Sequence, residues 1–242
     1  MNYQFDDGGN ITGIADALWT GGRDFAYDDV NRLTSAAGNF GPGLADVTHN
    51  YAYDAIGNIL SKAGVLYYYC NHPQQPALPQ DCNGPLHPSA VASTSDGNHY
   101  TYDNNGNTAT GAGRDLTWNV DNRVASVTAP GGTADMLYDY TGIRVKKSGS
   151  GVTTYFPFAG YEVTGTVFTK YIRVGNETLA ANKGGDKLFY HTDHLGGVNV
   201  ITNIFAVLVQ LDEYDPWGKV SRSEGTGNVE PTKGFTGKEL DL

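Results

Sequence analysis

The nonapeptide YAYDAIGNI at residues 51–59 decides the fold, because close copies of it recur along the chain. Residues 3–11 read YQFDDGGNI and residues 100–108 read YTYDNNGNT, and both align with residues 51–59 without a gap. The shared pattern is Tyr, any residue, an aromatic residue, Asp, two variable residues, Gly, Asn and a β-branched residue. Such self-similarity indicates one supersecondary unit that is used several times.

A second form of the repeat alternates with the first. Residues 25–33 read FAYDDVNRL and residues 116–124 read LTWNVDNRV, and each is followed by short polar and small residues. A worn copy, YDYTGIRV, lies at residues 138–145 and keeps the aromatic-Asp pair and the Gly at a closer spacing. The repeat therefore extends over the first 150 residues.

Each copy predicts a β-hairpin. Alternating aromatic residues such as Tyr51 and Tyr53 fall on one face of a strand. Asp54 starts a turn in which its carboxylate accepts backbone N–H bonds just ahead, and Gly57 supplies a positive φ. A four-residue connection of this kind suits a type I turn closed by a left-handed residue.

The Asn-Arg form predicts the same hairpin with different side chains. Asn31 and Asn122 are expected to take the left-handed position of the glycine. Arg32 and Arg123 are expected to lie over neighbouring aromatic rings. Tyr hydroxyls on these strands can reach water or a neighbouring backbone.

The composition agrees with an all-β chain. The 242 residues include 32 Gly and 16 Tyr, which favour turns and strands, and no long amphipathic helix is visible. A single hairpin is marginal in water, so successive hairpins are expected to pair with their neighbours. The predicted fold class is all-β, with repeated antiparallel β-hairpins forming a curled or spiralling sheet.

The charge balance argues against nucleic acid and against an anionic membrane surface as partners. The chain carries 16 Lys plus Arg against 26 Asp plus Glu, a net charge of −10, and its only adjacent basic pair is Lys146-Lys147. Phosphate backbones are bound through clustered basic residues, so no nucleic acid partner is expected. The longest aliphatic and aromatic stretch, residues 204–209, is far shorter than the ~20 residues of a membrane helix. The first residues show no signal peptide.

The chain is predicted to have two parts. Residues 1–150 form the repeat hairpin array, and residues 151–242 differ in texture while still alternating strand-forming runs with Gly. A Pro-rich insertion at about 70–99 contains both cysteines, Cys70 and Cys82. The sequence leaves open whether they form a disulfide or stay as two thiols.

More specific motifs lie near the C-terminus. Residues 190–202 read YHTDHLGGVNVIT, residues 214–219 read YDPWGK, and residues 234–241 read GFTGKELD. In this order and spacing, and together with the repeats, they resemble the RHS/YD-repeat (rearrangement hotspot, Tyr-Asp repeat) family. Residues 151–242 resemble the start of its RHS-associated core region. The resemblance covers nearly the whole chain except the Pro-rich insertion.

The resemblance implies a structural role. Members of the family form a shell of spiralling β-sheet that encloses a C-terminal toxin or effector, in polymorphic toxin and insecticidal toxin-complex systems. It implies a non-enzymatic bacterial module without a cofactor, secreted or delivered by a secretion system as part of a full-length protein. The expected partner is the remainder of its own chain or a toxin polypeptide. Because the family's self-cleaving segment and toxin follow the point where this chain stops, neither activity is carried over.

No catalytic or cofactor-binding residue is predicted, and the residues singled out by the motifs are expected to be structural. They are Tyr3, Asp6, Gly9, Asn10, Tyr27, Asp28, Asn31, Arg32, Tyr51, Tyr53, Asp54, Gly57, Asn58, Tyr100, Tyr102, Asp103, Gly106, Asn107, Trp118, Asn122, Arg123, Tyr190, Asp193, Gly196, Tyr214, Asp215, Pro216, Trp217 and Gly218.

Two other kinds of site compete with this structural interpretation. His191, Asp193 and His194 are weak candidates for a metal site, but on a strand His194 points away from the other two, so structural polar contacts are favoured. Exposed Trp and Tyr rings, at Trp19, Trp118, Trp217 and residues 67–69, suit stacking on sugars. A carbohydrate-binding or cell-surface adhesion module is therefore the alternative function. Exposed sheet edges also predict possible self-association.

Overall fold

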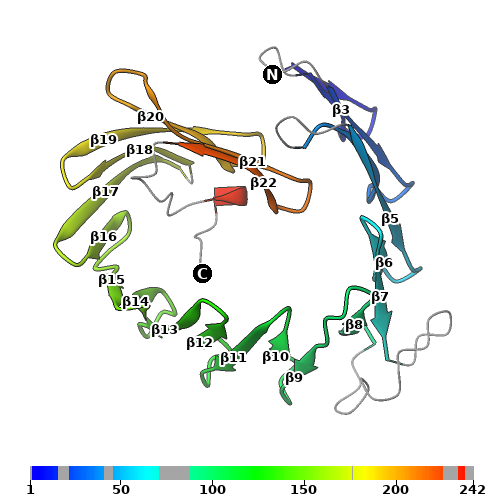
Figure 1. Cartoon of the computed structure of the whole chain (residues 1–242), viewed down its shortest axis with the longest axis horizontal. Helices are drawn as coiled ribbons and strands as arrows, with labels where there is room; N and C mark the ends of the chain where they lie inside the picture. Colours follow the sequence, from blue (N-terminus) through cyan, green and yellow to red (C-terminus); the bar gives the residue numbers. More distant parts are fainter. Residues whose placement is uncertain are drawn as a thin grey trace. The chain divides into compact units, whose positions relative to one another are not determined.

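The computed structural model describes residues 2–15, 22–40, 46–70, 88–175, 177–225 and 234–237 (Figure 1). The chain divides into two compact units, Met1–Gly113 and Arg114–Leu242. We refer to them as the first unit and the second unit. The described residues of both are built from antiparallel β-hairpins.

The first unit contains ten described strands that follow one another along the chain. They are β1 (Asn2–Phe5), β2 (Ile11–Ala15), β3 (Gly22–Tyr27), β4 (Leu33–Gly38), β5 (Val47–Tyr53), β6 (Ile59–Lys62), β7 (Val65–Tyr69), β8 (Val91–Thr94), β9 (Thr101–Tyr102) and β10 (Thr108–Gly111). From β1 to β8 each strand pairs with the next, and β9 pairs with β10.

The second unit continues the same arrangement. Its strands are β11 (Arg114–Trp118), β12 (Val124–Ala129), β13 (Gly132–Tyr138), β14 (Arg144–Gly149), β15 (Val152–Tyr155), β16 (Tyr161–Thr164), β17 (Val167–Val174), β18 (Glu177–Lys183), β19 (Asp186–Thr192), β20 (Val198–Asn203), β21 (Leu208–Tyr214) and β22 (Val220–Gly225). Each pairs with the next, and the short 3₁₀ turn η2 (Phe235–Gly237) contacts β20.

The prediction of an all-β chain of repeated antiparallel hairpins is confirmed. Pairing only with sequence neighbours is what a hairpin repeat requires, because each unit buries its surface against the next one along the chain. Among the described residues, no helix has the length and apolar character needed to cross a membrane.

The predicted boundary near residue 150 rests on the change in sequence pattern where the hairpin repeat ends, and it stays a prediction. The two compact units divide at Gly113, and β14 and β15 pair directly across residue 150. Cys82 and residues 71–87 of the predicted insertion lie outside the described residues. Cys70 is disulfide-bonded, and its candidate pairing with Cys82 falls on a residue outside the described part of the chain.

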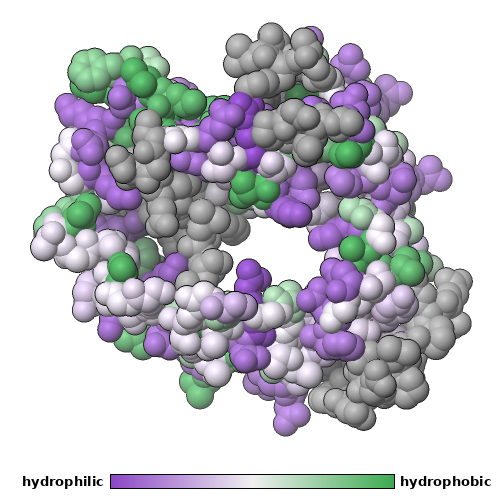
Figure 2. Space-filling view, viewed as in Figure 1, coloured by the Kyte–Doolittle hydropathy of each residue, from purple (hydrophilic) through white to green (hydrophobic). Residues whose placement is uncertain are grey.

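The buried residues gather in small clusters on one face of each sheet, as the alternation of side chains along a strand requires. In the first unit, Ala36, Phe40 and Tyr51 are buried, and Phe25, Leu33 and Tyr53 pack against them. The second unit has a small cluster of Val127, Ala134 and Met136, and a larger one of Tyr171, Ala181, Leu188, Tyr190, Val198, Ile201 and Val209. Hydrophobic side chains also reach the surface at the β20–β21 tip, where Phe205 is 81% exposed (Figure 2).

Candidate functional site: the Asp turns and the Tyr clamps

Hairpin turns along both units share one hydrogen-bond pattern, which we call the Asp turn. The backbone N–H of the first residue donates to the carbonyl of the residue four positions later. The N–H of the residue three positions after the first donates to the carbonyl of the first residue. The side-chain Oδ1 of the first residue accepts the N–H of the residue four positions on. The first residues are Asp6, Asp28, Asp54, Asp103, Asn119, Asp139, Asp193, Asn203 and Asp215.

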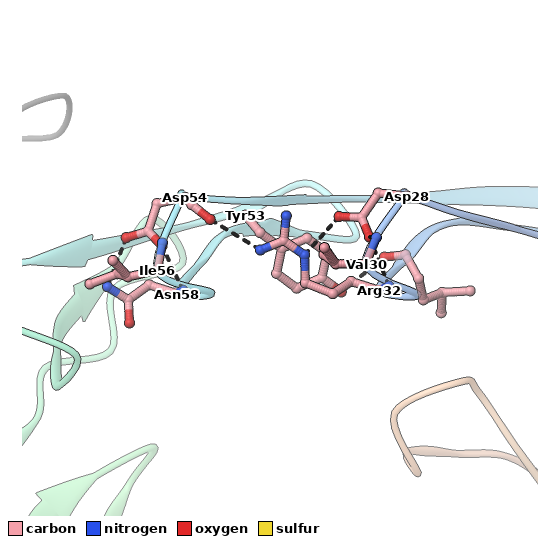
Figure 3. Close-up of polar contacts among 8 residues, drawn as sticks. Asp28, Val30, Arg32, Tyr53, Asp54, Ile56 and Asn58 are labelled. Carbon is pink, nitrogen blue, oxygen red and sulfur yellow. Dashed lines mark hydrogen bonds and ion pairs between the residues drawn. The ribbon is translucent and has the colours of Figure 1, made fainter.

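The turn at Asp54 shows how the sequence pattern produces this geometry (Figure 3). Asp54 Oδ1 accepts the N–H of Ile56 at 3.0 Å and of Asn58 at 2.8 Å. Its Oδ2 accepts the Asn58 side-chain amide at 2.8 Å. Gly57 has φ +96°, a conformation that costs a residue with a Cβ considerable strain. One Asp therefore satisfies several backbone donors that a tight turn leaves unpaired.

In the Asn-Arg form, the arginine links one turn to the next (Figure 3). Asn31 takes the positive-φ position at +61°. Arg32 Nε donates to Asp28 Oδ2 at 2.7 Å, and Arg32 Nη1 donates to the carbonyl of Asp54 at 3.1 Å. The same guanidinium lies 4.7 Å from the centre of the Tyr53 ring. Arg32 thus holds the Asp28 turn against the next repeat.

The second copy of this form repeats the arrangement in the second unit. Asn122 has φ +56°, and the Arg123 guanidinium lies 5.7 Å from the centre of the Tyr138 ring. The turn begins at Asn119 rather than at Asp, and the amide Oδ1 accepts the N–H groups of Asp121 and Arg123 at 3.0 Å each. An uncharged acceptor therefore supports the same turn.

A second contact, which we call the Tyr clamp, joins successive hairpins. The tyrosine that directly precedes a turn Asp donates its hydroxyl to the carbonyl of the residue that opens the returning strand of the hairpin before it. The donor and acceptor pairs are Tyr27 to Ile11 at 2.9 Å, Tyr53 to Leu33 at 2.9 Å, Tyr102 to Val91 at 2.8 Å, Tyr138 to Val124 at 2.8 Å and Tyr214 to Val198 at 3.2 Å. Tyr69 makes the same bond to Ile59 at 3.0 Å without a following Asp.

The two residues of the Tyr-Asp dipeptide thus stabilise different parts of the sheet. The Asp closes its own hairpin, and the Tyr fastens that hairpin to the previous one. The sequence indicates only that Tyr hydroxyls can reach a neighbouring backbone, and it does not name the acceptor. A spacing signal exists, because the accepting residue usually stands five positions after the preceding turn Asp, as Leu33 does after Asp28. Trp118 occupies the Tyr position before Asn119, so it has no hydroxyl for this contact.

Hydrogen bonds lower the pKa of the turn carboxyls, whereas burial raises the pKa of the clamp tyrosines. The Asn10 and Asn107 side chains lower the pKa of Asp6 and Asp103, so these carboxyls remain ionised acceptors at neutral pH. Burial raises the pKa of the Tyr27, Tyr53 and Tyr102 hydroxyls. The tyrosines therefore remain protonated donors.

Other residues singled out by the motifs occupy turns or buried strand positions. Gly9, Gly106, Gly196 and Gly218 all have positive φ, between +76° and +88°. Tyr190 is buried, with its ring centre 6.4 Å from that of Tyr171, while Tyr3 and Tyr100 are partly buried. Pro216 and Trp217 occupy the middle of the Asp215 turn, and Asp215 Oδ1 accepts the Trp217 N–H at 2.8 Å.

The weak metal candidates do not converge on one point. His191 Nε2 lies 3.0 Å from the Thr202 hydroxyl. Asp193 Oδ1 accepts the N–H groups of Leu195 and Gly197, so this carboxylate belongs to an Asp turn. Across the part of the chain that the structure describes, no group of three His, Cys, Asp or Glu could hold a metal ion.

The aromatic residues proposed for sugar stacking are also dispersed. Trp118 ends β11, whereas Trp217 lies in the turn between β21 and β22, and Trp19 lies outside the described residues. On β7, Tyr68 faces away from Tyr67 and Tyr69, and Tyr69 is buried with its hydroxyl bound to the Ile59 carbonyl. Carbohydrate binding stays a prediction, without a common platform of rings among these residues.

Sequence reasoning missed several buried polar contacts in the second unit. The Tyr171 hydroxyl donates to buried Glu162 at 3.0 Å. Near the end of the sheet, buried Arg222 donates to Glu224 through Nη2 at 2.7 Å, and Gln210 donates to buried Asp212 at 2.8 Å. These residues fall outside the repeat pattern, so the motif offered no signal for them.

Asp turns joined by Tyr clamps on an all-antiparallel sheet define a β-hairpin repeat protein. No family model matches the chain. Two curated relatives each match over 145 residues, 55% of this chain and 6% of their own length: the tRNA3(Ser)-specific nuclease WapA of Bacillus spizizenii at 27% identity and the tRNA nuclease WapA of Bacillus subtilis at 26%. This chain therefore spans only a small fraction of those proteins.

A solved structure shares the fold over almost the whole chain. The Photorhabdus luminescens Tc holotoxin pore, determined with a mutant TccC3, matches with a TM-score of 0.66 at 17% identity. The match covers 99% of this chain and 14% of the solved chain. The likeness shows an RHS-type fold for the hairpin array described here.

Proposed function

We propose that this chain is a non-enzymatic structural module of an RHS/YD-repeat protein of the polymorphic-toxin type. It forms part of a β-sheet shell that encloses or presents a C-terminal toxin or effector. The observation that carries the proposal is the joint use of Asp turns and Tyr clamps in consecutive hairpins. This arrangement lengthens a sheet by one unit at a time and gives each unit the same link to its predecessor.

The way in which this sheet is stabilised suits the wall of a shell. The buried clusters are small, and most strands contact only their two sequence neighbours. Side-chain hydrogen bonds to the backbone, such as Tyr53 to Leu33, supply part of the cohesion that a thick core gives to other folds. A sheet held in this way can present both faces to other polypeptides along its length.

The similar proteins support a toxin-related setting. The two Bacillus relatives are nucleases, and the solved neighbour is a toxin assembly. Because the matched segment is 6% of each relative, we assign this chain the carrier part and leave nuclease activity to other regions of those proteins. In this proposal the partner is the remainder of its own chain or a toxin polypeptide, in a bacterial protein delivered by secretion.

Protease protection tests the proposal on the protein encoded by the complete gene. We expect the segment downstream of residue 242 to resist protease while the repeat sheet is folded. The triple variant Tyr27→Phe, Tyr53→Phe and Tyr138→Phe should expose that segment, because each change removes one link between hairpins.

The matched control replaces Tyr68 and the fully exposed Tyr140 by Phe, which leaves every Tyr clamp in place. Protection should then persist. A downstream segment that is cleaved equally fast in all three proteins, or a purified repeat segment with its own catalytic activity, would overturn the proposal.

A further inference from the structure

One face of the second unit carries apolar and basic side chains, most of them exposed. We call it the apolar-basic face and define it by Lys146, Tyr155, Phe168, Lys170, Ile172 and Phe189. The strand registers place these residues on one side of the sheet, opposite the buried cluster. Lys146 pairs with Tyr155, Tyr155 and Phe168 both pair with Val163, and Ile172 and Phe189 both pair with Ala180.

The exposure of this face is large for a strand surface. Phe168 is 66% exposed, Ile172 is 52% exposed and Phe189 is 41% exposed. The two lysines lie over aromatic rings, with Lys146 Nζ 5.9 Å from the Tyr155 centre and Lys170 Nζ 5.7 Å from the Tyr161 centre. Contiguous apolar surface of this kind marks an interaction site more often than a solvated one.

The first unit provides an internal comparison, because it has the same fold without this chemistry. On the corresponding side of β3, β4 and β5, one row across the sheet is Asp24, Ala37 and Thr48. The next row is Ala26, Ser35 and Asn50. Small and polar side chains are thus sufficient for this side of a hairpin array. The apolar-basic face therefore reflects something other than folding.

We infer that the apolar-basic face docks an acidic polypeptide segment that also carries apolar side chains. Apolar groups of that segment cover Phe168, Ile172 and Phe189, and its carboxylates meet Lys146 and Lys170. Charge complementarity at the face selects this partner, because Lys146 and Lys170 place positive charge beside its aromatic and aliphatic side chains, where carboxylates can meet them. The inference does not depend on enclosure by a shell.

The test measures binding of synthetic peptides of equal length and apolar content whose net charge runs from acidic to basic, by fluorescence anisotropy. We expect selective binding of the acidic peptides that weakens as salt rises. The double variant Phe168→Ser with Phe189→Ser should raise Kd about tenfold or more, since apolar anchors dominate such interfaces. Both side chains are exposed, so folding should survive.

A charge-reversal pair keeps the test informative if the serine variant fails to fold. Lys146→Glu with Lys170→Glu should abolish the preference for acidic peptides. Its control, Arg114→Glu with Lys219→Glu, changes the net charge equally at exposed positions away from the face and should bind as the wild type does. The inference is overturned if binding does not depend on peptide charge, or if it is unchanged in both the serine double variant and the Lys146→Glu with Lys170→Glu variant. Binding only to anionic phosphatidylserine vesicles, or a dimer abolished by the same variants, would also overturn it.

Discussion

The two units use the same hairpin but differ in what lies on its faces. Both carry Asp turns and Tyr clamps, as Asp54 and Tyr53 show in the first unit and Asp139 and Tyr138 in the second. The first unit has a small buried cluster and a polar opposite face. The second has the largest cluster and an apolar-basic opposite face. Side-chain hydrogen bonds to the backbone therefore hold the sheet together in both units. The residues on the face opposite the buried cluster can then differ between the units.

The largest expected effect on stability is a difference between substitutions on the two faces of the second unit. Ile201 is completely buried and Ile172 is 52% exposed on the opposite face. Ile201→Ala should lower the free energy of unfolding by about 2–5 kcal/mol through lost packing and a cavity. Ile172→Ala should change it by no more than about 0.5 kcal/mol. Urea unfolding followed by circular dichroism measures both, and equal losses would contradict the assignment of the faces.

A smaller effect is expected from the turn carboxylate. Asp54→Ala removes the acceptor for the Ile56 and Asn58 N–H groups and should cost about 1–2 kcal/mol in unfolding free energy. Asp54→Asn should keep most of that stability, because Asn119 and Asn203 already support the same turn in the second unit. Chemical denaturation distinguishes them. If Asn is as damaging as Ala, charge rather than the acceptor atom holds the turn.

The clamp should contribute about equally in both units. Tyr53→Phe and Tyr138→Phe each leave a carbonyl without its hydroxyl donor, which should cost about 0.5–1.5 kcal/mol. Tyr140→Phe, two residues from Tyr138, alters a fully exposed ring and serves as the control with little expected change. Thermal unfolding of the three variants gives the comparison. A clamp variant as stable as the control would show that the link is dispensable.

The smallest expected effect is a difference in acid sensitivity. Hydrogen bonds lower the folded-state pKa of Asp6, Asp28, Asp96 and Asp103 in the first unit and of Asp139 in the second. A depressed pKa adds stability above the unfolded value of about 3.9 that is lost as the pH falls through the folded value.

The first unit should therefore loosen first as the pH is lowered below about 4. Hydrogen exchange read by NMR at stepwise lower pH measures protection in each unit. Asp103→Asn, which keeps the acceptor but cannot titrate, should reduce the difference. Loss of protection beginning in the second unit would contradict the prediction.

The turns were the most predictable part of the candidate site. A turn needs only local chemistry, so the spacing from Asp54 to Gly57 and Asn58 was enough to anticipate its geometry. The Asn203 turn escaped notice because Ala206, at φ +58°, stands where the pattern expects Gly or Asn. The acceptors of the Tyr clamps also escaped, because each lies in the previous hairpin and depends on how two strands pair.

The sequence by itself determined the hairpin, the identity of the turn residues and the all-antiparallel order, because each follows from interactions within about ten residues or between sequence neighbours. Only the tertiary structure decided which carbonyl each Tyr binds, how Glu162 and Arg222 are satisfied, and that Phe168, Ile172 and Phe189 share one exposed face with Lys170. The physical reason is register. Alternation divides each strand into two faces, but the pairing between strands decides which faces combine.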